Sequence, residues 1–246
     1  MRRSSLEKYD VIGDVHGCLD ALTRLLAALG YDAHGEHPEG RSIVFVGDLI
    51  NRGPDSAGVL RLAIDWRRRK RALTVMGNHD VILAKWLRGE PLEPGRGGLD
   101  ETIRQIESQP DSAHFKDEIR ALMADTPVYR ILDEGRLIVA HAGIEEKMIG
   151  HEDDPEVQRF ILYGDAIGKS PEGKTIRRDW AADYHGSAFI VYGHTPQDRA
   201  EIRHNTVNVD TGAVQGGRLT ALRWPEQTLV SVASNYSVSD RKDAAS

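Results

Sequence analysis

The 246-residue sequence predicts an α/β fold built on a largely parallel sheet with helices outside it. Three times in the first 89 residues, a short apolar run ends at a glycine followed by a polar residue and leads into a helix-like segment. Such alternation indicates βαβ units, in which helices connect neighbouring parallel strands.

The first three strand–helix pairs are well marked. "YDVIGD" (9–14), "SIVFVGD" (42–48) and "ALTVMGNHD" (72–80) are the strand segments. Leucines at helical spacing follow the first of them and stop at Gly30. The second helix is expected over 54–71, with Pro54 at its start, and the third over 81–89.

The second half is more broken. "GEPLEPGRGG" (89–98) is a loop by composition, and two helices are expected over about 99–124 as a cap beside the sheet. "VYRILDEGRLIVAHAG" (128–143) predicts two strands joined by an Asp-Glu-Gly turn, and short strands dominate from 187 onward. We expect a disordered start (1–8), one domain (9–233) and a flexible polar tail (234–246).

Composition narrows the function classes. Hydrophobic residues make up 40% and charged residues 28%, as in ordinary globular proteins. The net charge of −6 argues against a stable nucleic-acid complex. The single cysteine, the lack of a signal-like start and the lack of a long apolar segment suit a cytoplasmic protein without a membrane span.

Polar side chains follow five of the apolar strands, at the point where each strand ends. They are Asp14 and His16, Asp48, Asn78 and His79, His141, and His194. Because ligands bind at the carboxyl ends of strands in open α/β sheets, we expect these groups to meet at one edge. A mixed oxygen and nitrogen set suits Mn²⁺, Zn²⁺ or Fe²⁺, and a bridging carboxylate could hold two ions that activate water against phosphorus.

The motifs "GDVHG", "GDLINRG", "GNHD", "HAG" and "GHT", in this order, resemble the signature of PPP-type metallophosphoesterases. The similarity is greatest to the bacterial branch of bis(5′-nucleosyl)-tetraphosphatases of the PrpE and ApaH types, and extends to the phosphatase domain of bacterial polynucleotide kinase-phosphatases. "LYGDAIG", "IRRDWAADYHG" and "TVNVDTGAVQGGRLTALRWPE" carry it beyond the metal motifs. It runs from about Tyr9 to Val232.

The resemblance implies a calcineurin-like αββα sandwich with a small helical cap and a dinuclear metal site. One metal would be held by Asp14, His16 and Asp48, and the other by Asp48 as the bridge with Asn78, His141 and His194. The implied roles of the remaining residues are phosphate clamp for Arg52, leaving-group acid for His79, a contact to a histidine or substrate for Asp210, and extra phosphate contacts for Arg177 and Arg178.

The implied cofactors are two divalent ions, Mn²⁺ first, with Fe, Zn, Ni or Co as alternatives. The expected substrates are dinucleoside polyphosphates such as diadenosine tetraphosphate. A Ser/Thr or Tyr protein phosphatase, and an RNA-end phosphatase or 2′,3′-cyclic phosphodiesterase, remain open as alternatives. The chain is expected to act as a monomer or a homodimer.

Two positions depart from the family pattern. Asn51 stands where many relatives carry an aspartate that pairs with the acid histidine, and Gly97-Gly98 stands where a His-Gly pair is expected. An amide supports a protonated His79 less well than a carboxylate does. Because a phosphate leaving group needs little protonation, Asn51 favours anhydride substrates over phosphoserine.

Three other motifs suggest different functions. "GKSPEGKT" (168–175) matches a P-loop, for which "RFILY" would have to be a buried strand, but a surface loop is the alternative. "DTG" (210–212) matches aspartic proteases, and "RRRKR" (67–71) could bind nucleic acid or simply end a helix. A catalytically silent phosphate-binding domain is a further hypothesis.

Overall fold

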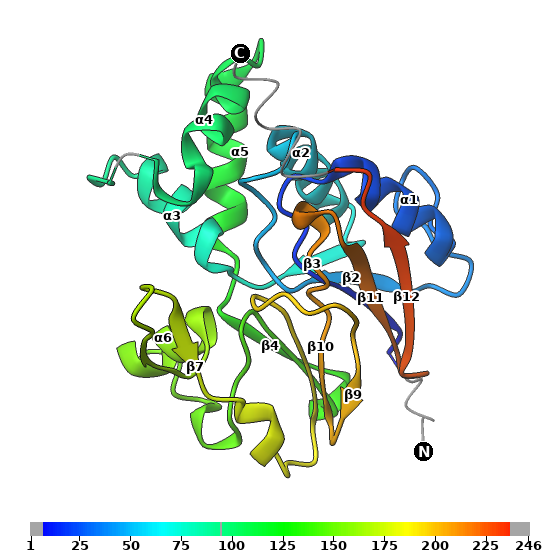
Figure 1. Cartoon of the computed structure of the whole chain (residues 1–246). Coiled ribbons are helices and arrows are strands. Elements are labelled where there is room, and N and C mark those ends of the chain that lie inside the picture. Colours follow the sequence, from blue (N-terminus) through cyan, green and yellow to red (C-terminus); the bar gives the residue numbers. More distant parts are fainter. Residues whose placement is uncertain (1–6, 94, 237–246) are drawn as a thin grey trace.

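The structure is a computed structural model that describes residues 7–93 and 95–236. Two five-stranded sheets pack face to face, with helices on both outer faces (Figure 1). The predicted α/β sandwich is therefore confirmed. Within the described residues, no helix combines the length and the apolar character needed to cross a bilayer.

The first sheet has the strand order β12-β11-β1-β2-β3. Its strands are β1 (Tyr9–Ile12), β2 (Ser42–Phe45), β3 (Ala72–Thr74), β11 (Arg218–Trp224) and β12 (Thr228–Ala233). The run β1-β2-β3 is parallel, as predicted, but β11 and β12 are antiparallel to their neighbours. The sheet is mixed because the last strands return through a tight turn instead of a helical crossover.

Five helices lie on the outer side of this sheet, and the last two of them pack against the second and third helices (Figure 1). They are α1 (Leu19–Leu29), α2 (Ser56–Arg68), α3 (Asn78–Leu87), α4 (Leu99–Glu107) and α5 (Ser112–Ala124). Helix α2 begins two residues after Pro54, because the Asp55 side chain caps it by accepting the Gly58 N–H at 2.7 Å. Helices α4 and α5 occupy the segment in which two helices were expected.

The second sheet has the order β4-β5-β8-β10-β9. Its strands are β4 (Tyr129–Leu132), β5 (Leu137–Ala140), β8 (Phe189–Tyr192), β9 (Ile202–Arg203) and β10 (Thr206–Asn208). The run β5-β8-β10 is parallel, and both edge strands are antiparallel. Helix α6 (Pro155–Tyr163) and the short helix η4 (Trp180–Asp183) cover its outer face.

Successive side chains along a strand point alternately toward the other sheet and toward the helices. Val11 faces the second sheet while Ile12 faces the helices, and Leu137 faces the first sheet while Ile138 packs under α6 and η4. The side-chain period of two in a strand explains why neighbours separate in this way. Buried aliphatic residues on both faces are what a sheet with two covered sides requires.

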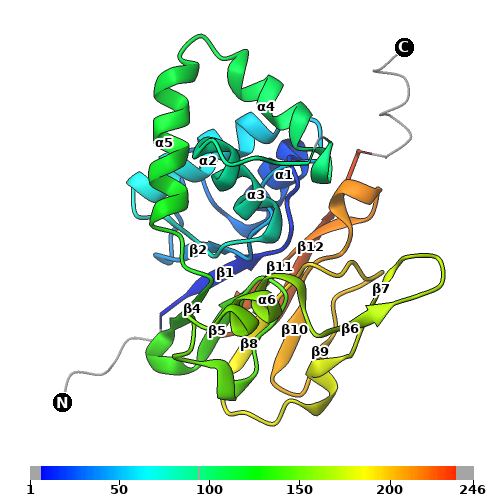
Figure 2. The ribbon, with the colours of Figure 1, turned by 90° about the vertical axis from the view of Figure 1, so that its left-hand side faces the viewer.

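The P-loop interpretation of "GKSPEGKT" is not supported by the fold. "RFILY" (159–163) lies in helix α6 instead of a buried strand. The motif itself belongs to the hairpin of β6 (Ala166–Lys169) and β7 (Thr175–Arg177), which projects from the second sheet (Figure 2). A P-loop needs a strand before it and a helix after it, so this segment is a surface hairpin.

The basic run at the end of α2 is neutralised by neighbouring acids. Arg67 pairs with Asp125, Arg68 with Glu118, and Arg69 with Asp65 at 2.8 Å. This segment therefore ends a helix on the protein surface, which is the simpler of its two interpretations.

A buried arginine ties the first sheet together. The Arg41 guanidinium, wholly inaccessible to solvent, donates to the Asp10 carboxylate at 3.1 Å and to Glu226 at 2.9 Å. It also donates to the carbonyls of Tyr9 at 3.0 Å and Trp224 at 2.8 Å. Arg41 therefore joins β1 to the end of β11.

We predict that Arg41→Met lowers the free energy of unfolding by about 3–5 kcal/mol, because it removes one of the two arginines that pair with buried Asp10 and leaves the Tyr9 and Trp224 carbonyls without this donor. Arg69→Met is the matched control: it removes an exposed pair with Asp65 and should cost no more than about 1 kcal/mol. Urea unfolding of both variants measures the difference. Equal losses would contradict this role for Arg41.

Candidate metal centre and phosphate site

The polar residues predicted at strand ends do meet at one edge of the sandwich. Each follows a parallel strand of one of the two sheets, so the carboxyl ends of both sheets contribute. The residues are Asp14 and His16 after β1, Asp48 after β2, Asn78 and His79 after β3, His141 after β5, His194 after β8 and Asp210 after β10. All but Asn78 and His194, which are half-buried, are buried.

The loop that carries Asp48 is tightly wound. Asp48, Asn51 and Arg52 have φ values of 48°, 71° and 69°, in the left-handed region that non-glycine residues rarely adopt. At Gly53, an added Cβ would lie 1.9 Å from the His16 carbonyl oxygen, so only glycine allows the two loops to approach. Such a backbone persists only when its surroundings hold it.

Asp80 supplies much of that hold. Its carboxylate accepts the backbone N–H groups of Asp48 at 2.8 Å, Leu49 at 3.2 Å and Gly77 at 3.0 Å. One buried side chain thus fixes the end of β2 against the start of α3. Sequence reasoning assigned Asp80 no role, although its place directly after Asn78 and His79 was a signal.

The first donor group contains His16 and Asp48, with Asp14 beside them. The His16 Nδ1 atom lies 2.8 Å from the Ile50 carbonyl oxygen, so Nδ1 carries the proton and Nε2 has the lone pair that could bind a metal. Nε2 lies 3.5 Å from Asp48 Oδ2. Asp14 is held by the backbone N–H of His194, at 3.1 and 3.2 Å from its two oxygens.

The second donor group surrounds His141. Its Nδ1 faces the Val46 carbonyl oxygen at 3.0 Å, which leaves the Nε2 lone pair free. Nε2 lies 3.0 Å from Asn78 Oδ1, 3.1 Å from His194 Nδ1 and 3.5 Å from Asp48 Oδ2. Ligands at right angles around a metal, each about 2.1 Å from it, lie roughly 3.0 Å apart, so these separations fit a bound cation.

Asp48 Oδ2 stands between the two donor groups. It lies 3.5 Å from His16 Nε2 and 3.5 Å from His141 Nε2. Asp48 belongs to two sets of residues, one with His16 and His79 and the other with His141 and His194. Within each set the possible ligand atoms lie within 4.8 Å of one another. This is the geometry that a bridging carboxylate needs.

Burial and crowding of like charges dominate the electrostatics of the site. Burial, and then Asp210 and Asp48, raise the pKa of Asp14 well above its ordinary value. Burial raises the pKa of Asp48 to about 7 and that of Asp210 to about 6. Burial also lowers the pKa of His141 to about 4, so its imidazole stays neutral. Divalent cations would relieve the crowding of these carboxylates.

Two arginines contact histidines of different donor groups. Arg52 Nη1 donates to His16 Nε2 at 3.3 Å, and Arg177 Nη2 donates to His194 Nε2 at 2.9 Å. Arg177 Nε also donates to the Tyr163 carbonyl at 2.7 Å, which anchors its side chain. Arg178 instead points to Asp165 at 2.7 Å.

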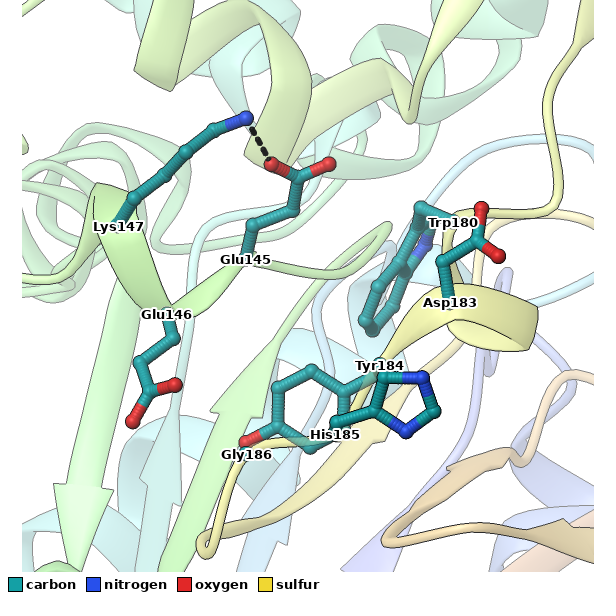
Figure 3. Close-up of a pocket in the computed structure, with 8 residues that line it drawn as sticks. All are labelled: Glu145, Glu146, Lys147, Trp180, Asp183, Tyr184, His185 and Gly186. Carbon is teal, nitrogen blue, oxygen red and sulfur yellow. Dashed lines mark ion pairs between the residues drawn. The ribbon is translucent and has the colours of Figure 1, made fainter.

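Two cavities near these residues differ in charge. One of about 240 Å³ has Arg177, Arg178 and Arg203 in its wall, next to Thr195 of the "GHT" motif. Asp165 and Asp179 also line it and pair with Arg178 and Arg203, so Arg177 is the arginine left over in this wall. The other, of about 590 Å³, is lined by Glu145, Glu146, Asp183 and neighbouring residues (Figure 3). In it Lys147 pairs with Glu145 at 2.5 Å (Figure 3). An acidic wall repels phosphates, so the smaller cavity is the better phosphate site.

The two positions that differ from the family pattern, Asn51 and Gly97, both lie next to His79. Asn51 Nδ2 is 2.9 Å from His79 Nδ1, and Thr102 Oγ1 is 2.7 Å from Asn51 Oδ1. A Cβ added at Gly97 would lie 2.8 Å from His79 Cε1, so a larger residue there would displace His79. Thr102 and Ser56, which contacts it at 3.1 Å, carried no motif and were missed.

The raised pKa of Asp48 predicts how pH acts on metal binding. A carboxyl group with a higher pKa in the folded than in the unfolded state loses its stabilising contribution as pH rises from about 4 to about 7. A bound cation offsets that loss, so adding Mn²⁺ to metal-stripped protein should raise Tm more at pH 8 than at pH 5. Asp48→Asn, which lacks the titrating group, is the control. An equal rise at both pH values in the native sequence would refute this.

Comparisons with known proteins agree with the geometry. The sequence profile of the calcineurin-like phosphoesterases matches residues 8–205. A bis(5′-nucleosyl)-tetraphosphatase PrpE (asymmetrical) of Bacillus thuringiensis is 43% identical over 237 residues, covering 93% of this chain and 95% of the relative. A protein of the same name from Halalkalibacterium halodurans is 42% identical, covering 96% and 97%.

Solved structures agree as well. A crystal structure of a protein provisionally described as a diadenosine tetraphosphatase superposes with a TM-score of 0.69 at 25% identity, covering 94% of this chain and 95% of that one. A cold-active protein tyrosine phosphatase has a TM-score of 0.61 at 18% identity, covering 92% and 79%, which shows the shared fold alone. The family resemblance drawn from the five motifs is confirmed. The chain belongs to the calcineurin-like phosphoesterase family.

Proposed function

We propose that this metal-dependent hydrolase cleaves a phosphoanhydride bond of dinucleoside polyphosphates, with diadenosine tetraphosphate as the representative substrate. One observation carries the proposal: Arg52 and Arg177 stand beside histidines of different donor groups, so a chain of phosphates lying across the site would meet both. Relatives named bis(5′-nucleosyl)-tetraphosphatases, 42–43% identical over nearly the whole chain, support it.

The donor atoms suit two divalent cations. Asp14, His16 and Asp48 would hold one, and Asp48, Asn78, His141 and His194 the other. We propose Mn²⁺ for both, with Fe, Zn, Ni or Co as alternatives, because oxygen and imidazole ligands are mixed. When bound, the cations supply an activated water and neutralise charge on the phosphate oxygens.

The chain's own residues then divide the remaining work. The Arg52 guanidinium is a planar fork that can bind two oxygens of the reacting phosphate. His79 assists the leaving oxygen by a hydrogen bond. Asp210, buried close to Asp14 and Asp48, adds negative charge that favours cations in the site. Asn51 orients His79 instead of charging it, which suits an acidic phosphate leaving group.

Both arginines become available to phosphate when the histidines act as ligands. His194 faces the donor group through Nδ1, so as a ligand it carries its proton on Nε2. Arg177 can only donate, and it must then leave that nitrogen. Its anchored position beside the 240 Å³ cavity lets it turn toward the distal phosphates of the substrate, with Arg178 as a second contact.

We predict that Arg177→Leu lowers kcat/KM for diadenosine tetraphosphate by about 10-fold or more, since a charge-assisted hydrogen bond contributes roughly 1.5–3 kcal/mol. p-Nitrophenyl phosphate, which has no distal phosphate, should change by less than about 3-fold on the same reasoning. Arg159→Leu, on the exposed face of α6 where Arg159 pairs with Glu156, is the control and should change neither.

The same Mn²⁺-supplemented assay tests the substrate class. A phosphopeptide and a 2′,3′-cyclic nucleotide represent the protein-phosphatase and RNA-end alternatives. Higher kcat/KM on either than on diadenosine tetraphosphate would overturn the proposed substrate. An equal loss on both substrates in Arg177→Leu would remove Arg177 from the distal phosphate site.

A further inference from the structure

The contact between Asn51 and His79 indicates which ring nitrogen of His79 carries the proton. Both side chains are buried, and Asn51 Nδ2 lies 2.9 Å from His79 Nδ1. An amide nitrogen donates, whereas an amide oxygen accepts, so the end of the amide that faces His79 decides whether Nδ1 is bare or protonated. The far end of the same amide settles that choice.

Thr102 sits at that far end. Its hydroxyl oxygen is 2.7 Å from Asn51 Oδ1 and 3.1 Å from Ser56 Oγ. Ser56 Oγ accepts the backbone N–H of Asn51 at 3.0 Å and is the more distant of two acceptors for the Thr102 hydroxyl. Thr102 has a single proton, and the nearer acceptor is Asn51 Oδ1 at 2.7 Å. The amide oxygen of Asn51 therefore faces Thr102, and its nitrogen faces His79.

Helix α4 places Thr102 with the help of its neighbour Gln105. Gln105 Oε1 accepts the backbone N–H groups of Ser56 at 2.7 Å and Ala57 at 3.3 Å, and its Nε2 donates to the Pro54 carbonyl at 3.0 Å. Helix α4 is therefore locked onto the start of α2. Thr102 is fully buried in this contact and has little freedom to move.

We propose that Thr102 is a positioning residue that orients the Asn51 amide and so holds His79 as the neutral tautomer with its proton on Nε2. The contacts run from Thr102 through Asn51 to His79 Nδ1. A carboxylate at position 51 would do the opposite, because it accepts a proton from Nδ1. This inference rests on the proposed function only in giving His79 Nε2–H a leaving oxygen to assist.

The direct test is the ¹⁵N NMR tautomer signature of His79 at fixed pH in the full-length protein loaded with diamagnetic Zn²⁺. The native chain and Thr102→Ser, which keeps the hydroxyl, should show the proton on Nε2. Thr102→Val removes the donor to Asn51 Oδ1, so both amide orientations become accessible and an Nδ1–H population should appear. Asn51→Asp should show Nδ1–H whether residue 102 is Thr or Val.

Kinetics separate positioning from general damage. Thr102→Val should leave KM within about 3-fold and lower kcat more for phenyl phosphate than for p-nitrophenyl phosphate, because the more basic phenolate depends more on a hydrogen bond from His79. A merely structural role would lower both equally without changing the tautomer.

Results that contradict the role of Thr102 differ from results that contradict the proposed substrate. A native chain with Nδ1–H, or Thr102→Val with an unchanged Nε2–H signal, overturns the inference whatever the substrate is. If Thr102→Val does not fold, Thr102→Ala also removes the donor to Asn51 Oδ1, and an unchanged Nε2–H signal in that variant would overturn the inference. Absence of diadenosine tetraphosphate turnover refutes the proposed substrate alone.

Discussion

The Asp48 carboxylate is the point at which the two halves of the donor cluster meet. One of its oxygens lies at the same distance from a histidine of each group, and those histidines come from different sheets. The other oxygen accepts the backbone N–H of His79 at 2.9 Å, which orients the carboxylate. The position of Asp48 therefore depends on the packing of the whole sandwich and, in turn, relates both sheets to one site.

Holding Asp48 there requires an unusual backbone. The left-handed residues of the 47–53 loop are stabilised from several directions: by the Asp80 carboxylate, by the His16 ring on the Ile50 carbonyl and by the Ser56 hydroxyl. The Tyr236 hydroxyl donates to the Arg52 carbonyl at 3.0 Å and adds a fourth support. Buried carboxylates with raised pKa values then make the cluster a place that favours cations.

Much of this site could be predicted from sequence, because the polar residues that meet there directly follow strands and form short motifs. Asp14, Asp48 and His141 were identifiable for that reason. Thr102 was not, because its role depends on how helix α4 packs against α2, which no local pattern records. The antiparallel pairing of β11 with β1 was likewise missed, since alternation of strands and helices in the first half favours parallel pairing. The expected tail falls mostly at 237–246, outside the described residues, while Tyr236 contacts the Arg52 loop.

The bridging position of Asp48 is best tested by counting metal ions. Inductively coupled plasma mass spectrometry of Mn²⁺-loaded, desalted protein should give two ions per chain for the native sequence. His16→Ala and His194→Ala should each retain about one ion, since each removes a ligand from a single group. Asp48→Asn should lose both. Two ions retained in Asp48→Asn, or a single ion in the native chain, would contradict the account.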